Sequence, residues 1–580
     1  MIWTRLTAAV VVTVTMVASS TVAQAKRGSV AKLDVTNFDA RSFDARRLIV
    51  KFAEGTGIRL RAGTLRAKAD VDLDAVLELA KTATLERLFV EPDHVLDAQR
   101  AEAMQELPVG WDLPADLTLY CVWTVSTEAE GRQICAKLNA LDIVETAFPD
   151  HRAGIESDPG DIPPTTPNYS SRQDYFDAPP NGIDIRRSWR IPGGRGEQLQ
   201  VLDIETGLII DHEDIPEGVA KNVIGPNPSP TDHGLAVAGE MVAGRNGYGV
   251  DGGVYMARYK FHSHQSRNWA PSVNTAATHS KRGDVIVLEV HLTHPVSLKK
   301  VPMENRQDVF DAVRVATMRG IHVVAAAGNG SQDLDAAVYK RIFDRTFRDS
   351  GSVIVGASNG ATLARASFSN YGKMVDAAGW GYNVTTTGYG ALFYPNRDAR
   401  QKYTAAFSGT SSATPIVTSA AAAVISAASY QLGRVLKPAE ARALLRVHGT
   451  AIPNGKIGPR PDLKKLLSAI GLPNGLEQTA PAKIGGAIQL EVSGTSGDLW
   501  VLYISAGSAQ IATPFGRLLI DLASALPMAG GVLTGGKVAY RTAVPNDKVL
   551  QRNEFHWQAL RFDALGKRLS LSTSVATFIE

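Results

Sequence analysis

The sequence predicts an α/β domain with a mainly parallel β-sheet, which lies between a smaller α+β domain and an antiparallel β-sandwich. The central domain is indicated by four near-continuous apolar runs, a pattern typical of parallel strands that are buried on both faces. These runs are Leu199–Ile204, Val285–Val290, Ile321–Ala327 and Val353–Ala357. Between the second and third runs, apolar residues at helical spacing (Val309, Val313, Ala316) lead to Gly320, which completes a βαβ pattern.

The first 25 residues have the pattern of an export signal. Arg5 supplies the positive charge, residues 6–17 are apolar, and Ala23-Gln24-Ala25 matches the small-x-small cleavage pattern. The alternative is a membrane anchor, but a run of about a dozen residues is too short for a hydrocarbon core of ~30 Å. We therefore expect cleavage near Ala25 and secretion, to the medium or to the periplasm of a Gram-negative host. No other segment is predicted to span a membrane.

Residues 26–150 predict a small α+β domain. Strands are expected at Leu48–Phe52, Leu117–Val125 and Ile143–Phe148, and helices at Asp74–Leu88 and Ile134–Leu141. Thr127 and Glu130 form a capping-box pattern before the second helix. Strands that alternate with helices in this order suggest a ferredoxin-like sandwich. The chain's two cysteines, Cys121 and Cys135, both fall here and are either buried thiols or one local disulfide.

The remaining boundaries follow from changes in composition. Residues 151–184 are rich in proline and other turn formers and predict an exposed linker. The α/β domain then occupies 185–470 and closes with a helix over Pro438–Val447. Residues 480–580 contain short strand-like runs separated by turns, as in a β-sandwich. Aromatic residues in these runs, such as Trp500 and Trp557, are expected in the sandwich core, with a polysaccharide- or protein-binding surface as the alternative.

The net charge does not favour nucleic acid or an anionic membrane as the main partner. The chain has 61 basic and 58 acidic residues and a net charge of +3, so no electrostatic argument favours nucleic acid as the ligand.

Three strings in the α/β domain carry candidate catalytic residues. Asp203 follows an apolar strand, His233 opens a helix of small residues, and Ser411 precedes the alanine-rich helix Ile416–Ala428. A serine hydroxyl becomes a nucleophile when an imidazole accepts its proton, and a carboxylate must orient that imidazole. In a parallel sheet, such groups gather beyond the carboxyl ends of the strands.

A fourth string, residues 325–330, ends a buried strand with Ala-Gly-Asn-Gly. The side-chain amide of Asn329 can donate a hydrogen bond to a developing oxyanion, and the loss of one such donor typically costs about 2.7–4 kcal/mol of transition-state stabilisation. Each of these four residues alone could instead be a turn or helix-cap residue. Together they predict acyl transfer.

These strings resemble those of the subtilisin-like serine peptidases (subtilases), in the order Asp, His, Asn, Ser. The strongest match is Gly-Thr-Ser-Ser-Ala-Thr-Pro at residues 409–415. The resemblance covers roughly residues 185–450 and implies a three-layer α/β/α fold and a secreted endopeptidase that is synthesised as a self-processing zymogen. Residues 26–150 are similar to subtilase propeptides, which assist folding and inhibit the enzyme. No organic cofactor is implied, and protein or peptide substrates are expected.

The sequence departs from the subtilase pattern in two places. Leu235 replaces the threonine that usually follows His-Gly, and Glu289 and His291 replace a Ser-Leu-Gly edge that binds the substrate backbone. We expect Glu289, His291 and Gly328 to contact substrate, with Glu289 favouring basic side chains. The alternative for Glu289 is a carboxylate paired with a nearby Arg or His.

No metal site is identified. The pairs His262/His264 and His291/His294 lack a zinc-site spacing, and although many subtilases bind structural calcium, no Asp/Asn-rich loop marks a site here. A non-catalytic binding protein that uses the subtilase scaffold and acts through the β-sandwich is the alternative function.

We predict that maturation cuts the chain within residues 150–180, because proteolytic cleavage concentrates in proline-rich stretches of this kind that are expected to be exposed linkers. N-terminal sequencing of the secreted protein checks this. A mature N-terminus outside that stretch would contradict the predicted boundary.

Overall fold

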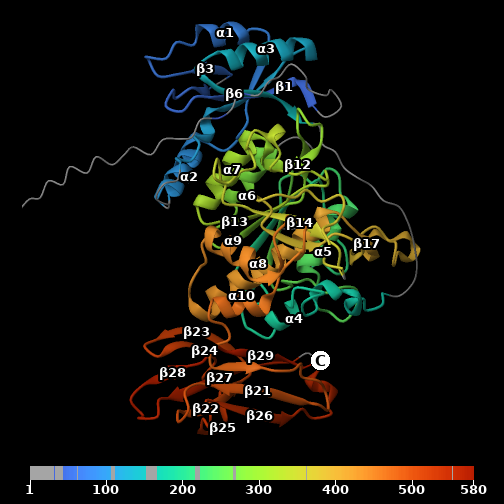
Figure 1. Ribbon diagram of the computed structural model, residues 1–580, viewed down its shortest axis with the longest axis vertical. Helices are drawn as coiled ribbons and strands as arrows, with labels where there is room; N and C mark the ends of the chain where they lie inside the picture. The colour runs from blue at the N-terminus through green and yellow to red at the C-terminus, as the bar shows by residue number, and fades with distance from the viewer. Residues whose placement is uncertain are drawn as a thin grey trace, which may run out of the picture.

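The computed structural model describes residues 43–61, 63–105, 112–151, 166–215, 222–264, 269–360, 362–551 and 553–579, together with Val30, Lys32 and Leu107. They form three units along the long axis of the molecule: an N-terminal α+β unit, a central α/β unit and a C-terminal β unit (Figure 1). The predicted export signal and the first part of the predicted linker lie outside the described residues.

The central unit is built on a parallel sheet, which confirms the predicted α/β class. Within the described residues the sheet has seven strands in the order β15-β14-β13-β10-β7-β9-β8. Every pair along this order is parallel. Its strands are β7 (Gln200–Glu205), β8 (Val223–Ile224), β9 (Arg258–Ser263), β10 (Val285–Leu288), β13 (His322–Ala326), β14 (Val353–Ser358) and β15 (Ala377–Trp380).

The strand order reverses between β7 and β10. From β7 the chain goes to the edge strand β8, comes back to β9 beside β7, and then crosses to build β10, β13, β14 and β15 on the other side. Such a reversal leaves a crevice beyond the carboxyl ends of the two strands, where ligands bind in open α/β sheets.

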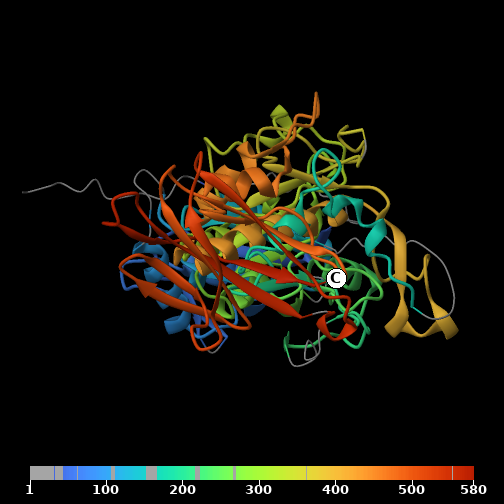
Figure 2. The same cartoon turned by 90° about the horizontal axis from the view of Figure 1, so that it is seen from below.

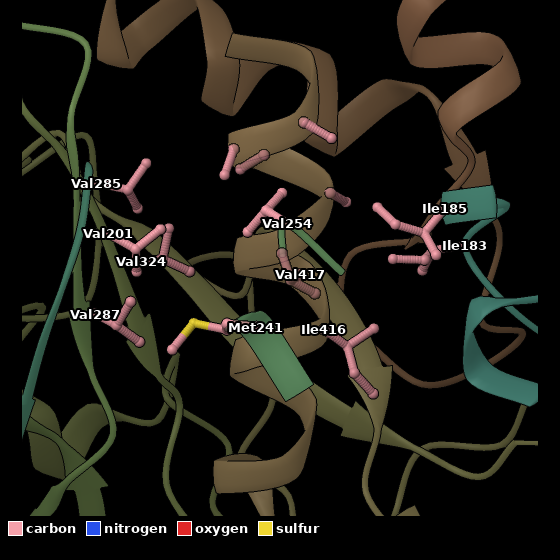
Figure 3. Packing of buried hydrophobic residues seen from close by; sticks show 14 of the residues in the cluster. Ile183, Ile185, Val201, Met241, Val254, Val285, Val287, Val324, Ile416 and Val417 are labelled. Carbon is pink, nitrogen blue, oxygen red and sulfur yellow. The ribbon is translucent and has the colours of Figure 1, made fainter. Parts of the chain in front are cut away.

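Helices cover both faces of this sheet, and together they form the three-layer fold. On one face lie α5 (Asp232–Val242) and α8 (Thr410–Leu432), and on the other α6 (Trp269–Thr278) and α7 (Gln307–Met318). Figure 3 shows Val201, Val285, Val287 and Val324 of the sheet on one side of α8 and Ile416 of this helix on the other side, toward Ile183 and Ile185. The unit closes with α9 (Pro438–Val447) and α10 (Leu463–Ala469).

Helix α8 is strongly apolar and lies inside the central unit. It is long and apolar enough to cross a membrane, and it is the only such helix in the part of the chain that the structure describes. However, its apolar window is completely buried inside the central unit. Small side chains explain this placement, because alanine-rich turns allow the sheet and neighbouring helices to approach the helix axis closely.

The N-terminal unit is a four-stranded antiparallel sheet in the order β4-β5-β1-β6, the ferredoxin-like arrangement that was predicted. Its main elements are β1 (Phe43–Phe52), α1 (Asp74–Ala80), β4 (Thr84–Arg87), α2 (Asp93–Gln105), β5 (Tyr120–Thr124), α3 (Glu128–Ala140) and β6 (Val144–His151), with a short hairpin of β2 (Arg59–Arg61) and β3 (Thr64–Arg66). Thr127 caps α3 by accepting a hydrogen bond from the Glu130 N–H. Cys121 and Cys135 are buried free thiols, which excludes the local disulfide.

The predicted helix over Asp74–Leu88 is wrong in its second half. Helix α1 ends at Ala80, and residues 84–87 form the edge strand β4 instead. Pairing with β5 through Leu85↔Trp123 gives these residues a sheet partner, and this tertiary contact outweighs the local helical spacing. Helix α2 was not predicted.

The C-terminal unit is a sandwich of two antiparallel sheets, as predicted. One sheet is β20-β21-β26, with β20 (Leu476–Gln478), β21 (Ala487–Ser493) and β26 (Lys537–Ala543). The other contains β22 (Leu499–Ser505), β25 (Leu526–Val532), β27 (Glu554–Phe562), β28 (Leu569–Leu571) and β29 (Val575–Phe578). Figure 2 shows these strands from below. Trp500 and Trp557 are buried between the sheets, which confirms their predicted place in the core.

Short hairpins and connections complete the fold. They are β11 (His291–Thr293) with β12 (Lys300–Pro302), β16 (Val384–Thr387) with β17 (Tyr403–Phe407), β18 (Gly449–Thr450) with β19 (Arg460–Pro461), and β23 (Ser508–Thr513) with β24 (Gly516–Ile520), together with the short helix α4 (Ile185–Ser188).

A buried ion-pair network joins the N-terminal unit to the central one. The guanidinium of Arg306, just before α7, pairs with Asp150 of β6 and with Asp308. All three side chains are at most 1% exposed. Asp150 also accepts a hydrogen bond of 2.8 Å from Arg47 of β1. Apolar side chains of both units pack around the network in one continuous cluster that includes Phe148, Val309 and Val313.

We predict that Arg306→Met lowers the free energy of unfolding of the uncut chain by about 3–5 kcal/mol, because it leaves Asp308 buried without its cation. Urea unfolding of the chain measures this. The matched control is Arg446→Met: Arg446 is 43% exposed and its partner Asp376 keeps a second arginine, Arg345. The control should lose about 1 kcal/mol or less. Equal losses in both variants would show that the buried network adds nothing special.

Candidate active site

The carboxyl end of β7 meets the first turn of α5. Thr231 caps this helix by accepting a hydrogen bond from the Gly234 N–H, which places His233 at the helix N-terminus. Glu205, the last residue of β7, lies with its Oε1 2.5 Å from His233 Nδ1. Its Oε2 accepts a hydrogen bond of 2.7 Å from the Thr206 N–H. Burial alone would raise the pKa of Glu205, but the charge and hydrogen bond of His233 outweigh it and lower that pKa.

This geometry corrects the residue predicted to orient His233. Asp203 lies on the same strand two positions earlier. Its side chain is therefore on the same face of the sheet as that of Glu205, but farther from the carboxyl end of the strand. Its Oδ2 accepts a hydrogen bond of 2.8 Å from the hydroxyl of Tyr259, and its Oδ1 has no hydrogen-bond partner among the described residues. The sequence did contain a signal for Glu205: it is the carboxylate directly before the Thr206–Gly207 turn, at the end of the strand.

Ser411 lies in the first turn of α8, next to the end of β10. Its Oγ is 3.5 Å from the main-chain oxygen of Glu289, the residue that follows β10. Phe407, four residues earlier, contacts the His233 ring, with ring centroids 5.5 Å apart. Since β10 and β7 are neighbouring parallel strands, Ser411 and the Glu205–His233 pair gather at the same edge of the sheet.

Asn329 is fixed against the start of α8. Its Oδ1 accepts hydrogen bonds from the main-chain N–H of Thr410 at 2.9 Å and from the Thr410 hydroxyl at 3.0 Å. These two bonds determine which way the amide faces. The Nδ2 group is therefore turned toward Gly409 and the main-chain nitrogen of Ser411.

Gly409 keeps this corner open. Its φ of +109° is strained for any residue with a side chain. A Cβ atom at this position would lie 3.1 Å from Asn329 Nδ2 and 3.5 Å from the Ser411 nitrogen. Both potential donors thus border the same small space beside Gly409.

The structure contradicts the role predicted for the Glu289 side chain. The carboxyl is buried, with the residue 2% exposed, and neither oxygen has a hydrogen-bond partner among the described residues. It therefore neither faces a substrate pocket nor pairs with an Arg or His. The reason is strand alternation: Glu289 continues the face of Val285 and Val287, which points into the core toward α8.

The other two predicted substrate-binding residues lie together beside Asn329. His291 begins β11 and is half-buried. A Cβ atom on Gly328 would lie 3.2 Å from the Cβ of His291. The two residues therefore border the same side of the site.

The described residues contain no group of three His, Cys, Asp or Glu side chains able to hold a metal ion. The histidines considered for that role contact protein groups. His262 Nδ1 lies 2.8 Å from the Ile224 oxygen, His264 Nε2 lies 3.1 Å from the Thr206 hydroxyl, and His294 Nδ1 accepts a hydrogen bond from the Ser297 N–H.

The chain is similar to known proteins of one family. The pattern of the Subtilase family (Peptidase_S8) matches residues 203–458. The "Extracellular serine proteinase" of Thermus sp. (strain Rt41A) is 31% identical over 236 residues, which are 40% of this chain and 50% of that protein. "Subtilisin BL" of Lederbergia lenta is 30% identical over 238 residues, or 40% of this chain and 77% of that protein.

Among solved structures, the "Epidermin Leader Peptide Processing Serine Protease" from Staphylococcus aureus is similar with a TM-score of 0.47 and 16% identity, covering 73% of this chain and 99% of that one. The protein described here belongs to the subtilase family of serine peptidases. It spans about half of the Thermus relative's length.

We predict that Gly409→Ala lowers the free energy of unfolding by about 1–3 kcal/mol, because the added Cβ crowds Asn329 Nδ2 at 3.1 Å and the residue is held in a sparsely populated backbone region. Chemical denaturation of the purified chain measures it. Gly566→Ala is the control, because Gly566 also has a positive φ but no atom lies within 4 Å of an added Cβ. The control should lose less. The same loss in both variants would mean that backbone strain alone, and not contact with Asn329, limits position 409.

Proposed function

We propose that this protein is a secreted serine endopeptidase in which Ser411, His233 and Glu205 form the catalytic triad. The observation that carries the proposal is the contact of 2.5 Å between His233 Nδ1 and Glu205 Oε1 at the sheet edge where Ser411 also lies. Ser411 attacks the scissile carbonyl of a protein substrate, and His233 accepts its proton through Nε2. His233 then returns the proton to the leaving amine, and water hydrolyses the acyl-enzyme.

Glu205 takes the part that aspartate commonly has in such triads. With its Oε1 on Nδ1, it fixes the tautomer that leaves Nε2 free to accept the serine proton, and it stabilises the imidazolium that forms. The longer side chain of glutamate fits because Glu205 is the final residue of β7, whereas Asp203 lies deeper in the sheet.

The oxyanion is stabilised by Asn329 and by the main-chain N–H of Ser411. Two features support this role: the Asn329 amide is oriented by Thr410, and Nδ2 and the Ser411 nitrogen border the same space beside Gly409. The N-terminus of α8 adds a partial positive charge at this place. His291 and Gly328, beside Asn329, are proposed to contact the substrate main chain.

The N-terminal unit is proposed to be an inhibitory propeptide that the enzyme removes itself. Its docking on α6 and α7 through a buried apolar cluster and the Arg306 network supports this role. The predicted export signal supports secretion, as does the name of the extracellular Thermus relative. The C-terminal sandwich has no assigned ligand; a polysaccharide or protein ligand is compatible with it.

The test compares wild type, Ser411→Ala, Glu205→Gln and Asp203→Asn for self-processing and for the rate of labelling by a fluorophosphonate probe. Wild type should mature and label, whereas Ser411→Ala should stay uncut and unlabelled. Glu205→Gln should react about 10⁴-fold more slowly, because an amide does not orient the required tautomer.

Asp203→Asn is the matched control, because it makes the same acid-to-amide change two residues earlier. It should label at least about a hundred times faster than Glu205→Gln, given that only the latter changes the contact with His233. If Asp203→Asn labelled more slowly than Glu205→Gln, Asp203 and not Glu205 would be the carboxylate of the triad. A folded wild-type chain that loses its N-terminal unit but never labels would instead favour the non-catalytic binding protein.

A further inference from the structure

Three further carboxyl groups lie buried in the layer beneath the triad. Asp203 of β7, Glu240 of α5 and Glu289 after β10 are each at most 2% exposed. All of them lie between the sheet and helices α5 and α8. The catalytic sequence proposed above does not use any of the three side chains.

Glu289 is closest to the reacting groups by its place in the sheet. The parallel register pairs Val287 with Asp203 and Leu288 with Ile204, so the next residue, Glu289, comes level with Glu205. Neighbouring strands are about 4.8 Å apart, so the two glutamates are adjacent on one face. The main-chain oxygen of Glu289 also contacts the Ser411 hydroxyl.

The other two carboxyl groups of the layer come from the sheet and from a helix: Asp203 lies two residues before Glu205 on β7, and Glu240 lies on α5. Asp203 accepts the Tyr259 hydrogen bond on Oδ2, while its Oδ1 has no partner in the described residues. Glu240 is two helical turns from His233 on the same face of α5, and neither of its oxygens has a partner there either.

Among the described groups that face this layer, only one, His233, can supply a positive charge to a carboxylate. His233 is already paired with Glu205. His264, next to Thr206, is buried against Trp269, and burial lowers its pKa to about 4, so it is neutral at higher pH. Tyr259 and Ser411 are neutral donors. A second ionised carboxyl would therefore be buried without a cation, which costs several kcal/mol. Burial raises the pKa of Asp203, Glu240 and Glu289 well above the usual range, in agreement with this count.

We propose that Asp203 and Glu289 are positioning residues that act in the protonated form, and that loss of a proton from this pair sets an alkaline limit to catalysis. The inference rests on the proposed function. While both are neutral, Glu205 is the only negative group beside the imidazole. Once one of them ionises, it adds a buried negative charge beside the Glu205 carboxylate and close to Ser411, where attack on the carbonyl develops an oxyanion, and this repulsion raises the barrier to attack.

This mechanism predicts the direction in which activity changes with pH. Activity should be present when the pair is protonated and should fall as pH rises through the apparent pKa of the pair. A triad alone imposes no such limit at this step, because its imidazole remains a competent base at high pH. The fall in activity therefore reports on the buried layer.

The test measures the rate constant of fluorophosphonate labelling against pH for mature wild type and for Glu289→Gln. In wild type we expect a bell-shaped profile. In Glu289→Gln, whatever the height of its plateau, the alkaline limb should move up by at least about one pH unit, a tenfold change in proton concentration, or disappear. Asp203→Asn should move the limb in the same direction.

The matched control is Glu304→Gln. Glu304 is also buried, with a pKa raised by burial, but it packs with Met303 on the opposite face of the sheet and accepts a hydrogen bond from Ser352. Its substitution should leave the alkaline limb in place. An alkaline limb that coincides in wild type and Glu289→Gln overturns the proposal.

Infrared difference spectroscopy gives a second readout that needs no activity. Because Glu240 and Glu304 are also buried acids with raised pKa values, the spectrum of Glu289→Gln is subtracted from that of the unsubstituted protein. In this difference, the carbonyl band of the protonated pair should be present near neutral pH and disappear in step with the alkaline loss of labelling. If no wild-type labelling occurs at any pH, the proposed function fails, while the infrared band still reports whether the pair holds its protons. Absence of that band near neutral pH overturns the proposal independently.

Discussion

The parallel pairing of β7 with β10 is the constraint on which the site depends. It brings Glu205 and the main chain of Glu289 to one edge of the sheet, at the point where the strand order reverses. Helices α5 and α8 then deliver His233 and Ser411 to that edge from the same face. Because the apolar side chains of α8 pack against the sheet and α5, the N-terminus of α8 is held beside Asn329, where we propose that the oxyanion is stabilised.

Much of this arrangement could be predicted from the sequence. The apolar runs identified the parallel strands, and the strings around His233, Asn329 and Ser411 identified groups that the structure brings to one edge. Local pattern failed where long-range contacts decide the outcome. Residues 84–87 have helical spacing but pair with β5, and the choice between Asp203 and Glu205 depends on how far β7 extends before its turn.

Glu289 illustrates a different limit. A carboxylate at the end of a strand can face either the cleft or the core, and only the pleat of the folded strand decides which. In this protein it faces the core, beside two further acids and without a basic partner in the described residues. Sequence patterns do not indicate such an arrangement, since uncompensated buried acids contradict the usual rule that buried charges are paired.

The network around Arg306 divides evenly between the two units that it joins. Arg47 and Asp150 both belong to the N-terminal unit, whereas Arg306 and Asp308 both belong to the central one. If the chain were cut between the units and they separated, each would leave with a complete pair of opposite charges. Separation would then leave no charged side chain buried without a partner of opposite charge. The network that holds the two units together therefore does not oppose their separation with an unpaired charge.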